Sequence, residues 1–360
     1  MTNARAVALG WLLLLSCMAL LALGACVGSV GFENLLTPLL DPQAGRAEQA
    51  MVWQIVTEIR LPRTLGAWTA GALLGLSGAL AQGLFRNPLA DPYLLGSASG
   101  ASLGVALMLA TLGGGGGMLG ASMMNAGMPV SMFSSSLWVR LGLTGAAFGG
   151  AVLAVLLTLA LARGVGHTLR LLLAGVVVGV VLGATTSLVL LFSPDSLQAM
   201  QAFMLGSTGF VGWTAWALMG GVWLLCMGGA WVLARVLDGL SLGEATAISL
   251  GLPLAPVRAA LIGLLALATG TAVAQTGLIA FVGLAAPHLV RVVVRVPYRL
   301  LMLLASLMGG TLLCAADVLA RWLIAPQELP VGVLTAVLGG VYLLWLMHRR
   351  SHHLHAGGRL

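Results

Sequence analysis

Few residues in this sequence have the chemistry for catalysis or metal binding, and their spacing does not bring them together. The four cysteines, Cys17, Cys26, Cys226 and Cys314, each lie inside an apolar stretch, without the spacing of a disulfide or a metal site. They are best interpreted as small apolar packing residues. The sequence contains no nucleophile beside a base and no cluster of metal ligands. We therefore predict that the chain is not an enzyme and holds no metal or covalently bound cofactor.

The chain contains no lysine, because all 17 of its cationic side chains are arginines. A P-loop needs its lysine to reach the terminal phosphates of a nucleotide, so this chain is not by itself an ATPase of that type. A net charge of +7 suggests nucleic acid as a partner. The arginines are scattered singly between apolar spans, however, which indicates a role in membrane topology and no nucleic-acid partner.

Two histidine-containing segments suggest metal binding or proton relay at first sight. Pro287-His288 is interpreted instead as a proline that ends a helix, followed by a histidine at the membrane interface. The remaining histidines near the carboxyl end lie in residues 348–360, which we interpret as a basic, solvated cytoplasmic tail.

The composition predicts a membrane protein. Of 360 residues, 59% are hydrophobic and 8% are charged, and the mean hydropathy is +1.04. A soluble domain carries about 25% charged residues, so a soluble globule and a disordered chain are both excluded. The 50 glycines indicate closely packed helices. We predict an all-α, polytopic fold in a lipid bilayer.

Stretches without charged residues predict about ten transmembrane helices, since a spanning helix needs roughly 20 apolar residues. Residues 23–26 resemble a lipoprotein cleavage box, but the first span is interpreted as a retained anchor because the rest of the chain is also membrane-like. A short helix is expected before the sixth span. The predicted spans are 6–32, 64–85, 97–112, 137–162, 171–192, 213–234, 256–275, 278–288, 300–323 and 331–347.

Ten crossings place both termini on one side of the membrane, and the arginines indicate which side. With both termini in the cytoplasm, 12 of the 17 arginines fall on the inner face, as the positive-inside rule expects. The five on the outer face are Arg46, Arg60, Arg63, Arg140 and Arg321.

Two similar segments suggest an internal repeat. Residues 77–84 in the second span resemble residues 270–278 in the seventh, and five spans separate them. An odd separation inverts one unit relative to the other, so helices 2–5 and 7–10 would form the inverted repeat common in transporters. Coincidence between segments rich in small residues is the alternative.

Several motifs occur in a specific order along the chain. Pro88 and Pro92 prevent a continuous helix, and nearby glycines allow tight turns. The motifs are Arg60-Leu61-Pro62-Arg63, Gln82, RNPLADP at 86–92, Gly243-Glu244 with Ala247, Leu250 and Gly251, GLIAFVGL at 277–284, Pro287-His288 with Arg291, and ELPVG at 328–332 with Thr335.

With these motifs the sequence resembles the membrane permease subunits of ABC importers for iron–siderophore complexes, haem and vitamin B12, over roughly residues 6–350. The resemblance implies one transmembrane permease domain (1–360) in the bacterial inner membrane, paired with a second copy in a homodimer or with a close homologue. It also implies two cytoplasmic ATPase subunits, which use ATP and Mg²⁺, and one periplasmic binding protein. The implied function is import of a metal chelate by alternating access.

The resemblance also assigns roles to residues at the two membrane faces. Arg60, Arg63 and Arg321 match positions that meet glutamates of the binding protein; the alternative is intramolecular pairing with Glu58 and Asp317.

On the inner face, residues 237–253 match the segment that couples the permease to the ATPase, and a plain amphipathic connector is the alternative. Glu244 would pair with an ATPase arginine or cap its own helix. The coupling residues are Gly243, Glu244, Ala247, Leu250 and Gly251.

The pathway itself is assigned to three short segments. Asn87, Pro88 and Leu89 match a narrowing near the cytoplasm. Residues 200–207, with Gly206 and Ser207, are expected to cap the periplasmic mouth. Small polar residues of the fifth span would face the pathway or bond back to helix carbonyls. They are Thr185, Thr186 and Ser187.

A transporter driven by protons or sodium ions is the competing function. Such proteins generally need carboxylates or unwound backbone inside the membrane. The chain has ten acidic residues, and Asp317 is the one that falls within a predicted span, which disfavours proton coupling. The motifs do not distinguish siderophore, haem and cobalamin as cargo.

Overall fold

The computed structural model describes residues 2–28, 31–32, 46–113, 137–164 and 168–356. This part is almost entirely helical, apart from one antiparallel pair of two-residue strands, β1 (Val27–Gly28) and β2 (Gly31–Phe32). The predicted all-α class is confirmed. The α-helices are α1 (Thr2–Cys26), α3 (Arg46–Gln54), α4 (Leu61–Leu84), α5 (Ser97–Gly113), α7 (Leu137–Leu161), α8 (Thr168–Phe192), α9 (Leu197–Leu205), α10 (Trp213–Ser241), α11 (Glu244–Ser249), α12 (Leu254–Thr276), α13 (Val282–Val293), α14 (Tyr298–Trp322) and α15 (Val331–Ala356).

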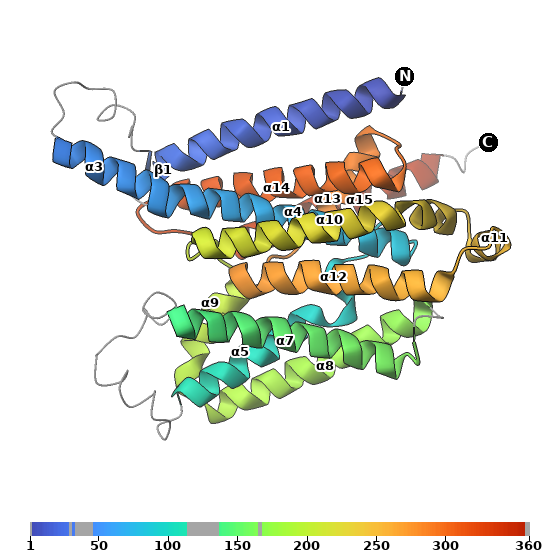
Figure 1. The fold of residues 1–360 in the computed structure, drawn as a ribbon, viewed down its shortest axis with the longest axis horizontal. Helices are drawn as coiled ribbons and strands as arrows, with labels where there is room; N and C mark the ends of the chain where they lie inside the picture. Colours follow the sequence, from blue (N-terminus) through green and yellow to red (C-terminus); the bar gives the residue numbers. More distant parts are fainter. Residues whose placement is uncertain (1, 29–30, 33–45, 114–136, 165–167, 357–360) are drawn as a thin grey trace.

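The long helices run side by side along one axis (Figure 1). In the described part, 7 helices are long and apolar enough to cross a membrane, and α5, α13 and α15 contain shorter apolar stretches. Together they account for the ten predicted spans. The start of α1, the end of α15 and the whole of α11 lie at one end of the bundle, here called the α11 end, and α3 and α9 lie at the other, the α9 end (Figure 1).

Several helix boundaries differ from the prediction. The first helix ends at Cys26, because the chain then pairs as β1 and β2. The last helix continues past residue 347 to Ala356. Pro287 was expected to end a helix, but it lies inside α13. A proline at this position leaves the carbonyl of Gly283 without its usual donor, and that carbonyl lies against Gly78 of α4.

The second span begins earlier than predicted, because α3, the π-helical segment η1 (Ile55–Arg60) and α4 form one continuous helix. Within it, the amide of Leu61 donates to the carbonyl of Val56, five residues back. A π turn is wider than an α turn, so it accommodates Pro62 without breaking the helix. Arg63, which was expected outside the span, is therefore a helical residue.

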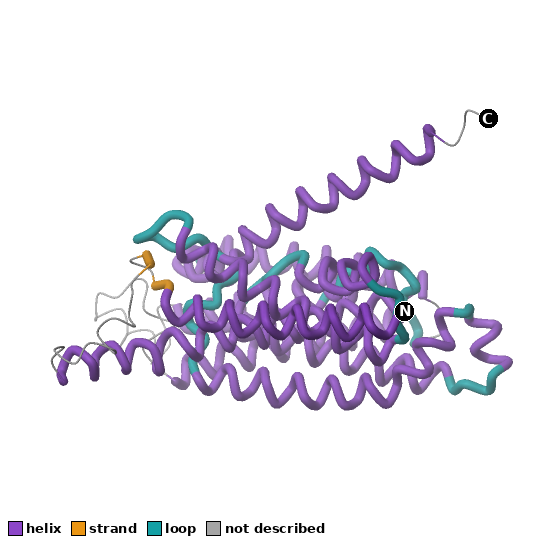
Figure 2. Tube along the Cα trace, turned by 90° about the horizontal axis from the view of Figure 1, so that it is seen from above, coloured by secondary structure: helices purple, strands orange, loops and turns teal. Residues whose placement is uncertain are grey.

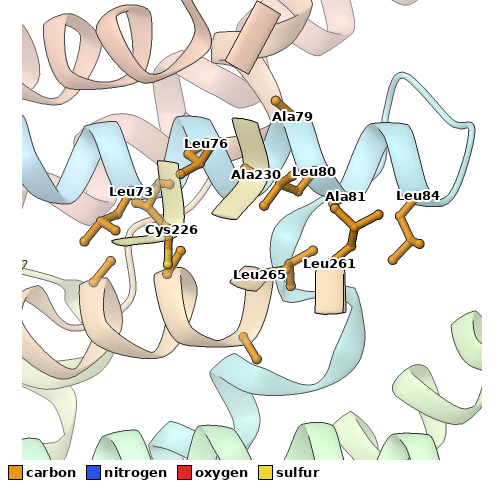
Figure 3. Packing of buried hydrophobic residues seen from close by; sticks show 14 of the residues in the cluster. Leu73, Leu76, Ala79, Leu80, Ala81, Leu84, Cys226, Ala230, Leu261 and Leu265 are labelled. Carbon is orange, nitrogen blue, oxygen red and sulfur yellow. The ribbon is translucent and has the colours of Figure 1, made fainter. Parts of the chain in front are cut away.

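Helix α4 is the centre of the bundle. Every residue from Thr69 to Leu84 is buried, and the helix packs against α10, α12, α13 and α14. Figure 3 shows Leu73 and Leu80 of α4 packed with Cys226 of α10 and Leu265 of α12. Lipid tails are as apolar as leucine, so burying leucine between helices gains little hydrophobic free energy in a membrane. Close van der Waals contact between the side chains stabilises the bundle instead.

Glycines on α4 permit the closest of these contacts. A Cβ on Gly71 would overlap the backbone carbonyl of Gly309, and one on Gly75 would overlap the carbonyl of Ala305. Both partners belong to α14, so a stripe of small residues lets the two backbones touch. The abundance of glycine in the sequence is explained in part by this contact.

The direction of the helices agrees with an inverted repeat. α4 runs from the α9 end to the α11 end, whereas α12, its predicted counterpart, runs the opposite way (Figure 1). Each is followed by a non-helical segment with a residue in the left-handed region, Arg86 after α4 and Gly277 after α12.

We predict that Gly75→Ala destabilises the protein by about 1–3 kcal/mol, because the added methyl group would force α4 and α14 apart. Thermal unfolding in detergent should show a Tm several degrees below that of the wild type. Gly228→Ala on α10 is the matched control, since a Cβ there would meet no atom within 4 Å. Equal Tm values for the two variants would contradict the assigned close contact.

Candidate transport and coupling sites

A cluster of charged side chains lies at the α9 end, centred on Asp317 of α14. The Asp317 side chain is fully buried, and its carboxylate accepts hydrogen bonds from Arg63 at 3.1 Å, Arg321 at 2.6 Å and the hydroxyl of Thr208 at 2.5 Å. Burying a carboxylate is costly unless it is paired and hydrogen-bonded. The three donors meet that requirement, and they come from α4, from α14 and from the segment between α9 and α10.

The same cluster fastens the end of α1 to the bundle. Arg321 donates to the carbonyl of Gly24 at 3.0 Å, and Arg60 donates to the carbonyls of Ala25 and Cys26 at 3.2 and 2.9 Å. The last carbonyls of a helix lack partners within the helix. The two guanidinium groups therefore cap the carboxyl end of α1.

The three arginines predicted to dock a binding protein are thus engaged inside the chain. Arg321 pairs with Asp317, as the intramolecular alternative describes, whereas the described contacts of Arg60 are to carbonyls of α1 and not to Glu58. Arg321 is 1% exposed and Arg60 is 7% exposed. Arg63 is the most accessible of the three, and it also pairs with Glu328 in two hydrogen bonds of 3.0 and 2.9 Å. The structure does not test the docking role, which stays a prediction.

At the α11 end, the short helix α11 projects from the bundle between α10 and α12 (Figure 1). Gly243 and Gly251, on either side of it, adopt φ values of +111° and +73°, which glycine adopts without strain. Ala247 is buried against the bundle, whereas Leu250 is 61% exposed. The predicted coupling segment therefore presents an apolar residue to its surroundings.

Glu244 lies beside two arginines from other parts of the chain. Its carboxylate lies 3.0 Å from Nη1 of Arg258 on α12 and 4.0 Å from Nη2 of Arg86, just after α4. The Arg258 side chain is 4% exposed and the Glu244 side chain 38%. From the sequence, Glu244 was expected to pair with an ATPase arginine or to cap its own helix. Arg86 and Arg258 could not be predicted as partners, because neither lies within one helical turn of Glu244.

The segment from Arg86 to Leu95 begins at the same end, after α4, and leads back into the bundle, where Pro92 lies against Gly283 of α13. The Asn87 side chain accepts a hydrogen bond from the amide of Leu89 at 2.9 Å, so it stabilises the turn around Pro88. Asn87, Pro88 and Leu89 are all exposed.

Asp91 caps the 3₁₀ turn η2 (Pro92–Leu95) by accepting from the amide of Tyr93 at 2.8 Å. Burial raises the pKa of the Asp91 carboxyl, and the hydrogen bond from Tyr93 acts in the opposite direction. The Tyr93 hydroxyl donates to the carbonyl of Ile279 at 3.1 Å, which ties the loop to the break between α12 and α13.

The three hydroxyl groups of α8 that were predicted to face the pathway bond back to their own helix. Thr185 donates to the carbonyl of Val181 at 2.8 Å and Thr186 to that of Leu182 at 2.9 Å. Ser187 does the same with a carbonyl four residues earlier. This is the arrangement that hydroxyls commonly adopt in membrane helices, and their placement along a pathway stays a prediction.

The predicted cap at the α9 end is built from interrupted helices joined through their backbones. The amide of Ser207 donates to the carbonyl of Thr276 at 2.8 Å, and the amide of Leu278 donates to that of Phe203 at 3.2 Å. Gly206 and Gly277 have φ values of +68° and +70°. Non-helical backbone at membrane depth is stable only where its polar groups are satisfied within the protein, and these bonds do so.

The sequence matches the FecCD transport family over residues 12–349. The chain belongs to the FecCD transport family. It is similar to the hemin transport system permease HmuU of Yersinia pestis, with 37% identity over 95% of each chain. It is also similar to the vitamin B12 import system permease BtuC of Salmonella typhimurium, with 38% identity over 94% of each.

A solved structure of a metal-chelate type ABC transporter in an inward-facing conformation aligns with a TM-score of 0.74. The sequence identity is 27%, and the alignment covers 97% of this chain and 99% of the other. This FecCD protein is therefore a multi-pass membrane permease of a metal-chelate ABC transporter, not an enzyme, and its family implies ATPase and substrate-binding partners.

The FecCD permease also has a polar link whose role the sequence interpretation did not assign. Arg291 of α13 donates to the side chain of Gln82 on α4 and to the Tyr298 hydroxyl at 3.1 Å. Asp238 in turn accepts from the amide of Tyr298 at 2.9 Å, so α4, α10, α13 and α14 are tied together at the α11 end. Both Gln82 and Arg291 stood among the sequence motifs, but their partners lie far away along the chain.

We predict that Asp317→Asn destabilises the permease by about 3–5 kcal/mol, because it leaves two arginines without their buried counter-charge. Glu328→Gln, which removes the half-exposed partner of Arg63, should cost about 0–1 kcal/mol. Thermal unfolding of both variants and of the wild type in detergent measures these losses of stability. A loss for Asp317→Asn no larger than that for Glu328→Gln would show that the buried cluster is not a main source of stability.

Proposed function

We propose that this permease imports a metal chelate (an iron–siderophore complex, haem or cobalamin) from the periplasm to the cytoplasm by alternating access. Two separate ATPase subunits would supply the energy at the α11 end. The observation that carries this proposal is α11 itself: a short helix between two left-handed glycines, which projects from the bundle and is held by Glu244 to Arg258. Because the chain has no lysine, it has no P-loop of its own. Energy from ATP hydrolysis would therefore reach it through a contact with another protein.

The orientation follows from the distribution of arginines. The α11 end carries most of them, so the positive-inside rule supports a cytoplasmic location for this end and for both termini. The membrane would be the inner membrane of a bacterium.

A second copy of the chain is proposed to complete the pathway. α8 and α15 carry large apolar residues that are more than half exposed, among them Val180, Leu191, Val341 and Leu344. Figure 2 shows α15 leaning away from the rest of the bundle. A homodimer that covers part of these faces would place the α8 hydroxyls and the loop of Asn87 to Leu89 along a central passage.

At the α9 end we propose docking of a periplasmic binding protein. Arg63 is the accessible member of the predicted set, and Arg60 and Arg321 would add to the positive potential from beneath the surface. Charges at such an interface steer the partner and set its orientation more than its affinity.

The competing ion-driven mechanism is disfavoured by the surroundings of Asp317. This carboxylate lies within a span, but two arginines and the Thr208 hydroxyl already occupy its oxygens. A proton or sodium site would have to displace an ion pair that joins α4, α14 and the segment between α9 and α10. Coupling by ATPase subunits makes no such demand.

Uptake into proteoliposomes tests the proposed function. We expect chelate uptake to require the permease, the ATPase subunits, ATP hydrolysis and the binding protein on the opposite face. Vesicles with a proton or sodium gradient and no ATPase are the control. Gradient-driven uptake in that control would favour the competing mechanism, and uptake unchanged without the binding protein would remove the docking role.

The link between Glu244 and Arg258 predicts a specific coupling defect. Glu244→Arg and Arg258→Glu should each lower the amount of chelate transported per ATP about tenfold, because α11 loses its fixed position on α12. The double variant restores opposite charges and should recover much of that ratio. Arg235→Glu, an exposed reversal on α10, is the matched control and should leave it unchanged. Absence of any recovery in the double variant would contradict a direct pairing role.

A further inference from the structure

A basic hollow lies at the α11 end, away from α11 itself. It has a volume of about 420 Å³ and is formed where the start of α1 meets the end of α13. Its lining consists of Arg5, Arg291, Val292, Val293, Val294 and Arg295. The transport functions proposed above make no use of this site.

The hollow is strongly positive. Three of its six lining residues are arginines and none is acidic. Arg5 and Arg295 are exposed, and among the described residues none of the three arginines takes part in an ion pair. Arg291 is oriented by the neutral side chains of Gln82 and Tyr298, so its charge is fixed in place but not neutralised by them.

The rest of the lining is apolar, and two of its three valines face outwards, whereas Val294 is buried. Val292 is 66% exposed and Val293 is 53% exposed. α1 lies along the outside of the bundle (Figure 1), with Trp11 and Leu15 more than 60% exposed. In a membrane protein such exposed apolar surfaces contact the hydrocarbon chains of lipids. The arginines lie beside these surfaces at the end of the bundle, at the level where lipid headgroups would contact the protein.

We propose that this hollow binds the headgroup of an anionic phospholipid. The guanidinium groups of Arg5, Arg291 and Arg295 would hold the phosphate, because a guanidinium matches the geometry of phosphate oxygens. The acyl chains would lie on Val292, Val293 and the outer face of α1. Basic pockets between helices at a membrane surface are known to select anionic lipids in this way.

The bound lipid would fasten the start of α1. On its inner face this helix packs through Ala6, Leu9 and Leu13 against residues of α13 and α14. Its other end is held by Arg60 and Arg321. A lipid phosphate bound by both Arg5 and Arg295 would hold the first turn of α1 against the end of α13, as the side chains of Arg60 and Arg321 hold the last turn. The inference is independent of the cargo and of the direction of transport.

Lipid retention by the purified full-length permease tests the inference. The protein is placed in nanodiscs of phosphatidylcholine with a minor fraction of phosphatidylglycerol, extracted in detergent, and its retained lipids are counted by native mass spectrometry. We expect selective retention of phosphatidylglycerol. Arg5→Gln/Arg295→Gln should weaken that retention roughly tenfold or more, whereas the corresponding lysine pair, which keeps both charges, should preserve much of it.

Arg235→Gln is the matched control, because it removes an exposed arginine at the same end but outside the hollow. It should behave as the wild type. If the double variant is unstable in detergent, Arg5→Gln alone gives the same test with a smaller expected loss.

Three results would overturn the proposal. One is equal retention of phosphatidylglycerol by the wild type and the double variant. Another is binding of inorganic phosphate by the permease in pure phosphatidylcholine nanodiscs with the affinity of the lipid, which would indicate a site for free phosphate. The third is loss of the ATPase subunits from the double variant with lipid retention unchanged, which would make the hollow a protein interface.

Discussion

A buried carboxylate inside an apolar bundle must find its counter-charges within the bundle, and Asp317 shows how much structure follows from that constraint. Arg63 and Arg321 reach it from α4 and α14, and Thr208 reaches it from the segment before α10. Each arginine then uses its remaining donors elsewhere, on Glu328 and on the end of α1. One acidic side chain thereby fixes how five segments meet at the α9 end.

The transmembrane spans were predictable from sequence because a run of roughly 20 apolar residues has few alternatives in a membrane. The positions at which the helices begin and end were less predictable. Residues 46–63 contain charges and Pro62 and fall outside the predicted spans, yet the structure continues the helix through them by way of a π turn. Pro287 lies inside α13, and the Gly283 carbonyl that it leaves without its helical donor lies against Gly78 of α4. Both outcomes depend on packing partners, which a single stretch of sequence does not reveal.

The same distinction applies to the functional side chains. The pairing of Arg321 with Asp317 could be predicted, because the two lie one helical turn apart. The pairing of Arg63 with Asp317 spans 254 residues and that with Glu328 spans 265, so residue spacing contains no trace of them. Glu244 is a similar case: its motif predicts a place in a coupling segment, but its partner Arg258 on α12 is seen only in the folded structure.

The two ends of the molecule differ in how their charges are held, and this difference bears on transport. The Asp317 cluster is buried, so separating its members would expose unpaired charges to an apolar surrounding. In the Glu244–Arg258 pair, by contrast, the carboxylate is 38% exposed, and glycines with positive φ stand on either side of α11. α12 contacts both ends, through Arg258 beside α11 and through Thr276, whose carbonyl binds Ser207 beyond α9. In the proposed mechanism, a displacement of α11 would be passed to α12 and, through that helix, to the segments predicted to cap the opposite end.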